Sequence, residues 1–142
     1  MRPFLCLLGY HARMKYQLNI YSSPWNSSAQ ADALAFATAL ISSEHQLVRI
    51  FFFMDGVYTG LNSQAPATDE PDWRQRWTAL QHSTQCELLL CIAASANRGL
   101  LNDSEAQRQA KPVVTVEAPF ELVGLGQWAA GFGDCDRVVS FR

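Results

Sequence analysis

The sequence has few charged side chains and no block of charges of one sign. Asp, Glu, Lys and Arg make up 17% of its 142 residues, against about 25% in an average soluble domain. The formal net charge is −2. This pattern lacks the electrostatic footprint of a protein that binds nucleic acid or an anionic membrane, so we expect neither as a partner. The low charge instead predicts that partner proteins cover part of the surface.

Metal-site and disulfide patterns are also missing. The four cysteines, Cys6, Cys86, Cys91 and Cys135, form no C-x-x-C pair and lack the spacing of a zinc site, and the three histidines are scattered. We therefore expect no metal and no cofactor. We interpret the cysteines as reduced thiols in a cytoplasmic protein.

Long apolar runs and internal repeats are absent as well. The apolar run at residues 3–8 is too short to cross a membrane, and no signal-peptide cleavage pattern follows it. We interpret residues 1–13 as an N-terminal extension. Residues 14–142 are then one domain, long enough to bury its own core.

One stretch stands out in what remains. Three leucines lead into Cys91 and are followed by small residues and Gly99, which predicts a buried strand over residues 87–93 that turns directly into a helix. Cys91 would lie at the carboxyl end of that strand, where open α/β sheets bind ligands. Free cysteines are also commonly buried as small apolar residues. Position alone therefore leaves two interpretations, a structural thiol and a nucleophile.

Five segments have the composition of strands and alternate with helical segments. Such alternation predicts a parallel sheet, because parallel neighbours need crossover connections. We expect an α/β, single-domain flavodoxin-like fold, with a five-stranded parallel sheet in flavodoxin-like order and helices on both faces. The expected strands cover residues 15–22, 46–54, 87–93, 113–116 and 137–141.

The helices are indicated by apolar residues at helical spacing and by capping residues. Ser27 or Ser28 is expected to cap the first helix, Pro71 to stand in the first turn of the second, and Asn102 to cap a short third helix. Residues 57–68 are expected to form a long loop. The side chains expected to face the core are Ala33, Phe36, Ala37, Leu40 and Ile41 in the first helix, Trp73, Trp77 and Leu80 in the second, and Leu125, Trp128, Ala129 and Phe132 in the last.

Four stretches, in the same order, resemble the TusD/DsrE family of sulfur-relay proteins: FFFMDGVY, APATDEPDW, CELLLCIAASANRGL and LVGLGQWAAGFGDCDRVVSF. The resemblance implies a DsrEFH-like sulfurtransferase subunit that receives sulfane sulfur as a cysteine persulfide and passes it to an acceptor thiol. It implies a heterohexamer of the TusBCD/DsrEFH type with related subunits, and sulfur donor and acceptor proteins with reactive cysteines. The process served would be tRNA 2-thiouridine synthesis or sulfur oxidation. The family's persulfide cysteine matches Cys91.

Sulfur transfer needs a thiolate, and the residues around Cys91 suggest how one is favoured. Bringing an ordinary thiol from a pKa of about 8.5 to about 7 takes about 2 kcal/mol, of which a helix amino terminus typically supplies about 0.3 to 1 kcal/mol. Arg98 is the nearest candidate for the remainder. No histidine lies near Cys91 in the sequence, which disfavours a Cys–His acyl-transfer pair.

Three more residues are candidates for supporting roles. Tyr58 follows a strand end at the same sheet edge as Cys91, so it is a candidate to line the cleft. Asp69 and Glu70 are candidates to orient a partner or to hold the long loop near the thiol, although acidic residues at a helix start commonly serve only the helix.

Two other functions remain open. The first is a scaffold subunit that has the fold but only positions other sulfur carriers. The second is a flavin- or nucleotide-binding module, in which the Ser- and Asn-rich residues 22–28 would cradle a phosphate. Pro24 and the lack of glycine in that loop disfavour the second function.

Overall fold

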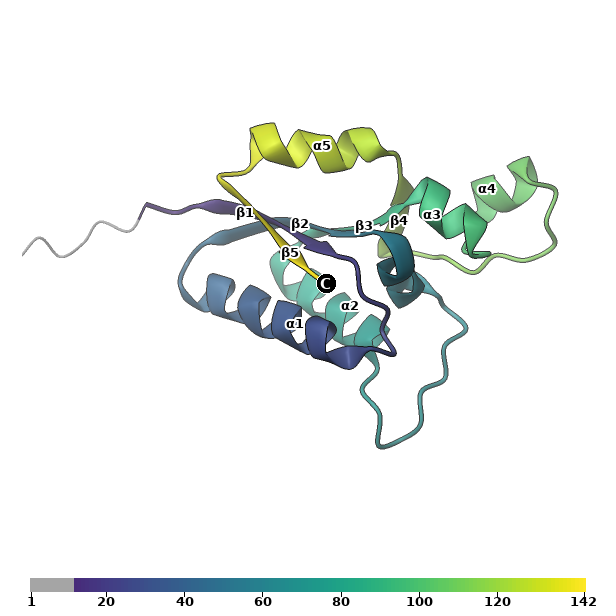
Figure 1. Cartoon of the computed structure of the whole chain (residues 1–142), viewed down its shortest axis with the longest axis horizontal. Helices are drawn as coiled ribbons and strands as arrows, with labels where there is room; N and C mark the ends of the chain where they lie inside the picture. The colour runs from purple at the N-terminus through teal and green to yellow at the C-terminus, as the bar shows by residue number, and fades with distance from the viewer. Residues whose placement is uncertain (1–11) are drawn as a thin grey trace, which may run out of the picture.

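The structure, a computed structural model, describes residues 12–142 (Figure 1). The expected extension at residues 1–13 lies outside the described residues except for its last two, and so does Cys6. The elements, in order, are β1 (Lys15–Ile20), α1 (Ser27–Ser42), β2 (Gln46–Phe52), the 3-10 helix η1 (Met54–Gly60), α2 (Trp73–Thr84), β3 (Glu87–Cys91), α3 (Ile92–Asn97), α4 (Asp103–Arg108), β4 (Phe120–Val123), α5 (Leu125–Asp134) and β5 (Arg137–Phe141).

All five strands are parallel and form one sheet in the order β4-β3-β2-β1-β5. Helices α1 and α2 lie on one side of the sheet and α5 on the other (Figure 1). The predicted α/β class, the five-stranded parallel sheet and the helices on both faces are therefore confirmed. The strand order is not the flavodoxin order 2-1-3-4-5. The chain steps from β1 through β2 and β3 to β4 in one direction, and then returns to place β5 beside β1.

The core lies between the sheet and the pair α1 and α2. Aligned residues form two apolar rows across the strands, and helix side chains cover them. Of the α1 side chains expected to face the core, Ala33, Ala37 and Leu40 are buried. Ile41, at the border of that helix face, is exposed. The strand rows are Leu18, Ile50, Leu88 and Phe120, and Ile20, Phe52, Leu90 and Leu122.

The opposite face of the sheet is polar where α5 covers it. Gln17 is fully buried there, and its amide donates to Asn19 at 3.0 Å and to the Trp128 carbonyl at 3.2 Å. Gly131 of α5 packs so closely on the Gln17 amide that no space remains for a Cβ. Helix α5 thus contacts the sheet through a glycine and a polar side chain.

The predicted apolar face of α5 is mostly not buried. Leu125 and Phe132 are 52% and 61% exposed, Ala129 is exposed, and Trp128 is half-buried against the core. The expectation that all four face the core is therefore wrong. Gly131, which has no side chain, allows the close approach to Gln17 and so sets which face of α5 meets the sheet.

The strand predicted at residues 113–116 is also wrong. This segment is irregular, with Val113 and Val114 exposed and with Val116 N–H bonded to the carbonyl of Leu101. The fourth strand is instead β4, whose Phe120 lies beside Leu88 of β3. The β-branched residues at positions 113–116 favour a strand locally. The sheet instead includes Phe120, which continues the apolar row that contains Leu88.

Helix starts differ from the expectations at two places. Asn26, not Ser27 or Ser28, occupies the N-cap position of α1, and its side chain makes no capping bond. Helix α2 begins at Trp73 and is capped by Asp72, which accepts from the Gln75 N–H at 2.9 Å, so Pro71 stands before the helix. The Asn102 cap of α4 is confirmed, with the Glu105 N–H at 2.9 Å from its side chain.

The predicted loop over residues 57–68 is shorter than expected, because η1 occupies residues 54–60. Its position depends on two glycines. Gly56 lies against the Ile20 carbonyl at the end of β1, and Gly60 lies against the Leu90 side chain at the end of β3. Neither position has space for a Cβ, so η1 rests directly on the carboxyl edge of the sheet.

Candidate functional site

Cys91 is the last residue of β3 and the N-cap residue of α3. Strand β3 lies inside the sheet, between β2 and β4, and Cys91 itself aligns with Val123. The predicted passage from strand to helix is confirmed, although the strand ends at Cys91 rather than Ala93. Cys91 therefore stands at the carboxyl edge of the sheet, with the unpaired N–H groups of the first turn of α3 beside it.

The thiol side chain of Cys91 is enclosed. Its residue is 2% exposed, and it makes no capping hydrogen bond to α3. Because side chains alternate along a strand, Cys91 points to the side of the sheet opposite Leu90, and Leu90 belongs to the row that faces α2. A small shift of the surrounding structure, such as α3, would be needed to bring another protein's sulfur to the thiol.

Ser95 is a polar residue of this site that the sequence analysis missed. It is fully buried, and its hydroxyl has no hydrogen-bond partner among the described residues. It lies four residues after Cys91, about one helical turn beyond the N-cap of α3. The available signal was a single hydroxyl residue in a run of alanines, at helical spacing from the cysteine.

Arg98 lies between α3 and η1. Its Nε donates to a carboxylate oxygen of Asp55 at 2.9 Å, and its Nη1 donates to the Ala94 carbonyl at 3.1 Å. The structure thus pairs this predicted site residue with an acidic residue that the sequence analysis did not single out. The pair joins the helix that follows Cys91 to the 3-10 helix above the sheet edge.

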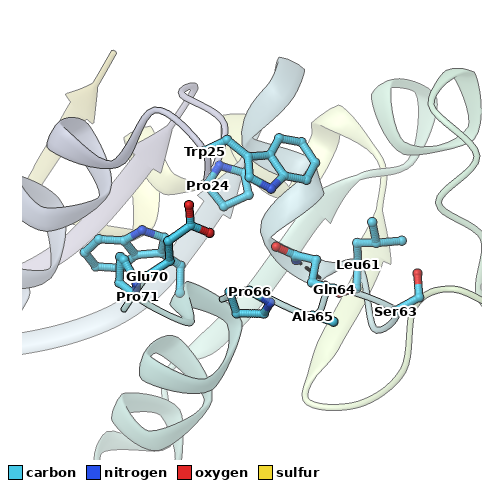
Figure 2. Close-up of a pocket in the computed structure, with 10 residues that line it drawn as sticks. Pro24, Trp25, Leu61, Ser63, Gln64, Ala65, Pro66, Glu70 and Pro71 are labelled. Carbon is cyan, nitrogen blue, oxygen red and sulfur yellow. Dashed lines mark hydrogen bonds between the residues drawn. The ribbon is translucent and has the colours of Figure 1, made fainter. Parts of the chain in front are cut away.

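Tyr58 lies on η1, where its ring centroid is 5.1 Å from that of Trp25 in the loop after β1. Its carbonyl accepts from the Gln64 amide at 2.7 Å. Asp69 and Glu70 are exposed and precede α2, whose cap is Asp72. Among these, Glu70 lines a pocket of about 400 Å³, together with Trp25 (Figure 2).

The predicted site residues therefore form two groups at one edge of the sheet. Cys91 and Arg98 belong to the side of α3, whereas Tyr58 and Glu70 belong to the region between the loop after β1 and the start of α2. Helix η1, which contains Tyr58, connects to α3 through the Asp55–Arg98 pair. Asp69 stands beside Glu70 on the exposed loop.

The other described cysteines differ from Cys91 in position. Cys86 is buried just before β3, and burial raises the pKa of its thiol. Cys135 lies between α5 and β5, where burial also raises the pKa. Five residues of strand separate Cys86 from Cys91, about 16 Å, so the two thiols do not form a pair. Both, like Cys91, are free thiols.

Within residues 12–142, no group of three or more His, Cys, Asp and Glu side chains is arranged to hold a metal ion. Over the same residues, no helix has the length and apolar character needed to span a membrane.

Comparisons with known proteins give one consistent family. A model of the DsrE/DsrF-like family matches residues 14–141. The sulfurtransferase TusD of Salmonella arizonae is 35% identical over 128 residues, which are 90% of this chain and 100% of the relative. The proteins of the same name from Salmonella paratyphi B and Salmonella heidelberg give the same identity and coverage. Among solved structures, the crystal structure of the ychN protein from E. coli has the same fold, with a TM-score of 0.70, 22% identity, and coverage of 90% of this chain and 99% of that chain.

Proposed function

We propose that this chain, which belongs to the DsrE/DsrF-like family, carries sulfane sulfur as a persulfide on Cys91. Its relatives include sulfur-relay proteins named sulfurtransferase TusD. The observation that supports this most is the position of Cys91. It ends an interior strand at the carboxyl edge of a parallel sheet and begins a helix without any intervening loop. Ligands and reacting groups typically lie at that edge of α/β sheets.

The proposed chemistry has two balanced steps. In the first, the Cys91 thiolate attacks the outer sulfur of a donor persulfide, a new S–S bond forms on Cys91, and the donor cysteine leaves as a thiolate. In the second, an acceptor thiolate attacks the outer sulfur on Cys91, and the Cys91 thiolate leaves. Neither step needs a metal, a cofactor or an outside oxidant, because the sulfane sulfur moves between thiolates.

Two features near Cys91 favour the anionic forms in these steps. The first-turn N–H groups of α3 lack intrahelical partners and are donors for a sulfur anion. The buried hydroxyl of Ser95 has no hydrogen-bond partner within residues 12–142, and we assign it as a donor to the persulfide, which extends beyond the cysteine sulfur by one S–S bond. Ser95 acts in this proposal as a positioning residue for the loaded form.

The other candidate residues hold the elements around Cys91 in place at the carboxyl edge of the sheet. Arg98 holds η1 against α3 through Asp55, and Tyr58 places the opposite end of η1 against Trp25. Asp69 and Glu70 lie on the loop beyond η1, where they are available to a partner. In this arrangement the residues shape access to the thiol rather than react themselves.

We further propose that the chain works in the cytoplasm in a heterohexamer with related subunits, and exchanges sulfur with donor and acceptor proteins that have reactive cysteines. The low charge content and the exposed Leu125 and Phe132 of α5 support association with other proteins. The relay would feed tRNA 2-thiouridine synthesis or sulfur oxidation.

Loading measured by intact mass tests the role of Cys91. After incubation with a low-molecular-weight persulfide, the wild-type protein should gain the mass of one sulfur atom, and the loaded protein should lose it again to an added thiol. Cys91→Ser should gain nothing, whereas the matched variants Cys86→Ser and Cys135→Ser should load normally. Equal loading of Cys91→Ser would exclude the proposal. No loading of wild-type protein in an intact complex with its related subunits would identify a scaffold subunit instead.

A further inference from the structure

Strand β5 forms one outer edge of the sheet, and its free side is open to pairing. Within residues 12–142 it is hydrogen-bonded to β1 alone, and it lies between the layers of α1 and α5 (Figure 1). Residues 138–141 carry no charge and include no proline, and the pairing with β1 has no bulge. Proteins commonly protect a free strand edge with charges, proline or bulges, because its backbone groups can pair with another strand.

The opposite edge of the sheet, β4, has such protection. Pro119 directly precedes this strand and has no backbone N–H. The charged side chain of Glu121 is exposed, and helix α3 contacts the strand. The two edges therefore differ, and β5 is the one suited to accept another strand.

The hydrogen bonds to β1 show which backbone groups of β5 point outward. The Phe141 carbonyl accepts from the Tyr21 N–H at 3.0 Å, so the backbone groups of Phe141 point toward β1. Backbone groups alternate in direction along a strand. Those of Val139 therefore also point toward β1, whereas those of Val138 and Ser140 point away from the sheet. Each of these two residues offers an N–H donor and a carbonyl acceptor to a strand beside β5.

Apolar side chains flank this edge on both faces of the sheet. On one face the Phe141 ring packs on Phe36 of α1, with the ring centroids 5.6 Å apart. On the other face α5 contacts β5 and exposes Leu125 and Phe132. A strand that pairs here therefore has to bring apolar side chains on both of its faces. A strand from the same three-layer architecture meets that requirement.

We propose that β5 pairs with β5 of a second copy of this chain, antiparallel and around a two-fold axis at Val139. In this register Val138 lies opposite Ser140 of the second copy, and the two residues exchange two hydrogen bonds. Asp136 lies opposite Arg142 of the second copy, so opposite charges meet at both ends of the paired strands. No like charges oppose each other. The edge is therefore complementary to itself, as a two-fold contact requires.

Sedimentation equilibrium of the full chain tests the pairing. The wild type should show a reversible monomer–dimer equilibrium with a Kd below about 1 mM. Ser140→Pro removes an outward N–H and leaves the bonds to β1 in place, because proline is tolerated where the N–H of an edge strand faces solvent. It should raise the Kd at least about tenfold, since each dimer loses two hydrogen bonds. Ser140→Ala keeps every backbone donor and should dimerise like the wild type.

A disulfide tests the register independently of the proline variant. In the proposed pairing the Cα atoms of the two Val139 residues lie about 4.5 Å apart, a separation that a disulfide spans. Val139→Cys should therefore give a covalent dimer under mild oxidation, with the bond mapped by peptide mass to position 139 of both copies. Arg137→Cys is the matched control on the same strand, because its two copies would lie about 14 Å apart. Circular dichroism and thermal unfolding check that each variant is folded.

Several results would overturn the proposal. One is a wild-type chain that stays monomeric up to about 1 mM. Another is a folded Ser140→Pro variant that dimerises as well as the wild type, which would place the association on a different surface. A third is equal cross-linking of Arg137→Cys and Val139→Cys. Loading of Cys91 with sulfur is a separate measurement, so none of these outcomes bears on the persulfide role, and a failure to load would leave the pairing of β5 untouched.

Discussion

The guanidinium of Arg98 lies 2.9 Å from the Asp55 carboxylate and fastens α3 to η1. Asp55 is 61% exposed in its side chain and Arg98 only 23%, so solvent screens much of their attraction. Arg98 also donates to the Ala94 carbonyl within α3. The positive charge near Cys91 is therefore paired with a negative charge, and the pair acts mainly by holding two elements together.

Arg98→Ala and Asp55→Asn provide a test of that role. Each should lower the free energy of unfolding by less than about 1 kcal/mol, because the pair is largely exposed. Both should speed alkylation of Cys91 by a neutral reagent, since α3, which begins at Cys91, would be held less firmly. If Arg98 instead stabilised the thiolate by its charge, Arg98→Ala would slow alkylation while Asp55→Asn would speed it. Opposite effects would therefore contradict the positional role.

Ser95→Ala separates a functional hydroxyl from a structural one. Removing a buried hydroxyl without a partner should leave the unloaded protein as stable as before, or more stable. Loading of Cys91 with sulfur should fall about tenfold, because a hydrogen bond to a charged group is lost. Ser104→Ala, on the exposed surface of α4, is the matched control. Normal loading with a lower unfolding temperature would instead show an ordinary packing role.

Two glycines of α5 should respond oppositely to alanine. In Gly131→Ala the new Cβ meets the amide of Gln17, which is fixed by bonds to Asn19 and to the Trp128 carbonyl. We expect a loss of stability of about 1 to 3 kcal/mol. Gly133→Ala has open space around it and should gain up to about 1 kcal/mol from helix propensity. Chemical denaturation of the two variants checks the contrast, and equal effects would contradict it.

Gln30 is a buried junction between elements. Its side chain accepts from Trp77 at 2.7 Å and donates to the Thr59 hydroxyl at 2.9 Å and to the Ser22 carbonyl at 3.1 Å. Gln30→Leu leaves these buried groups without partners and should cost about 3 kcal/mol or more. Combined with Trp77→Phe, which removes the indole N–H, the loss should be smaller than the sum of the two single losses. A strictly additive result in denaturation would argue against the bond.

The buried thiol of Cys86 should make stability depend on alkaline pH. Burial raises its pKa in the folded protein, so its contribution is fully present below the ordinary thiol pKa of about 8.5 and is lost as pH rises through the folded value. Denaturation at about pH 7.5 and pH 9.5 should show a smaller alkaline loss in Cys86→Ala than in the wild type. An unchanged loss would assign it to other groups, such as Cys135, whose pKa is raised too.

Local patterns were sufficient for most of the fold. The junction at Cys91 and the Asn102 cap were predicted because each depends on neighbours in sequence. The strand at residues 113–116 was predicted wrongly because its valines favour a strand locally, while the sheet selects Phe120 for its apolar row. The orientation of α5 could not be predicted, since it depends on Gln17 more than a hundred residues away.

The candidate site was predicted in part for a similar reason. Cys91 could be placed at a strand end from sequence, and the structure places it there. The Arg98–Asp55 pair and the pocket beside Glu70 join segments that are distant in the chain, so no local pattern indicated them. The isolated hydroxyl of Ser95 becomes visible only when burial and hydrogen bonds are known.

The pairing of β5 with β1 has a consequence for synthesis of the chain on the ribosome. Strands β1 to β4 can align as they emerge, but the outer edge of β1 stays unpaired until residues 137–141 have been made. An open strand edge is a template for pairing with other chains. A nascent chain of this protein is therefore most prone to aggregate before β5 has emerged, and shielding of β1 by a chaperone would matter most over that interval.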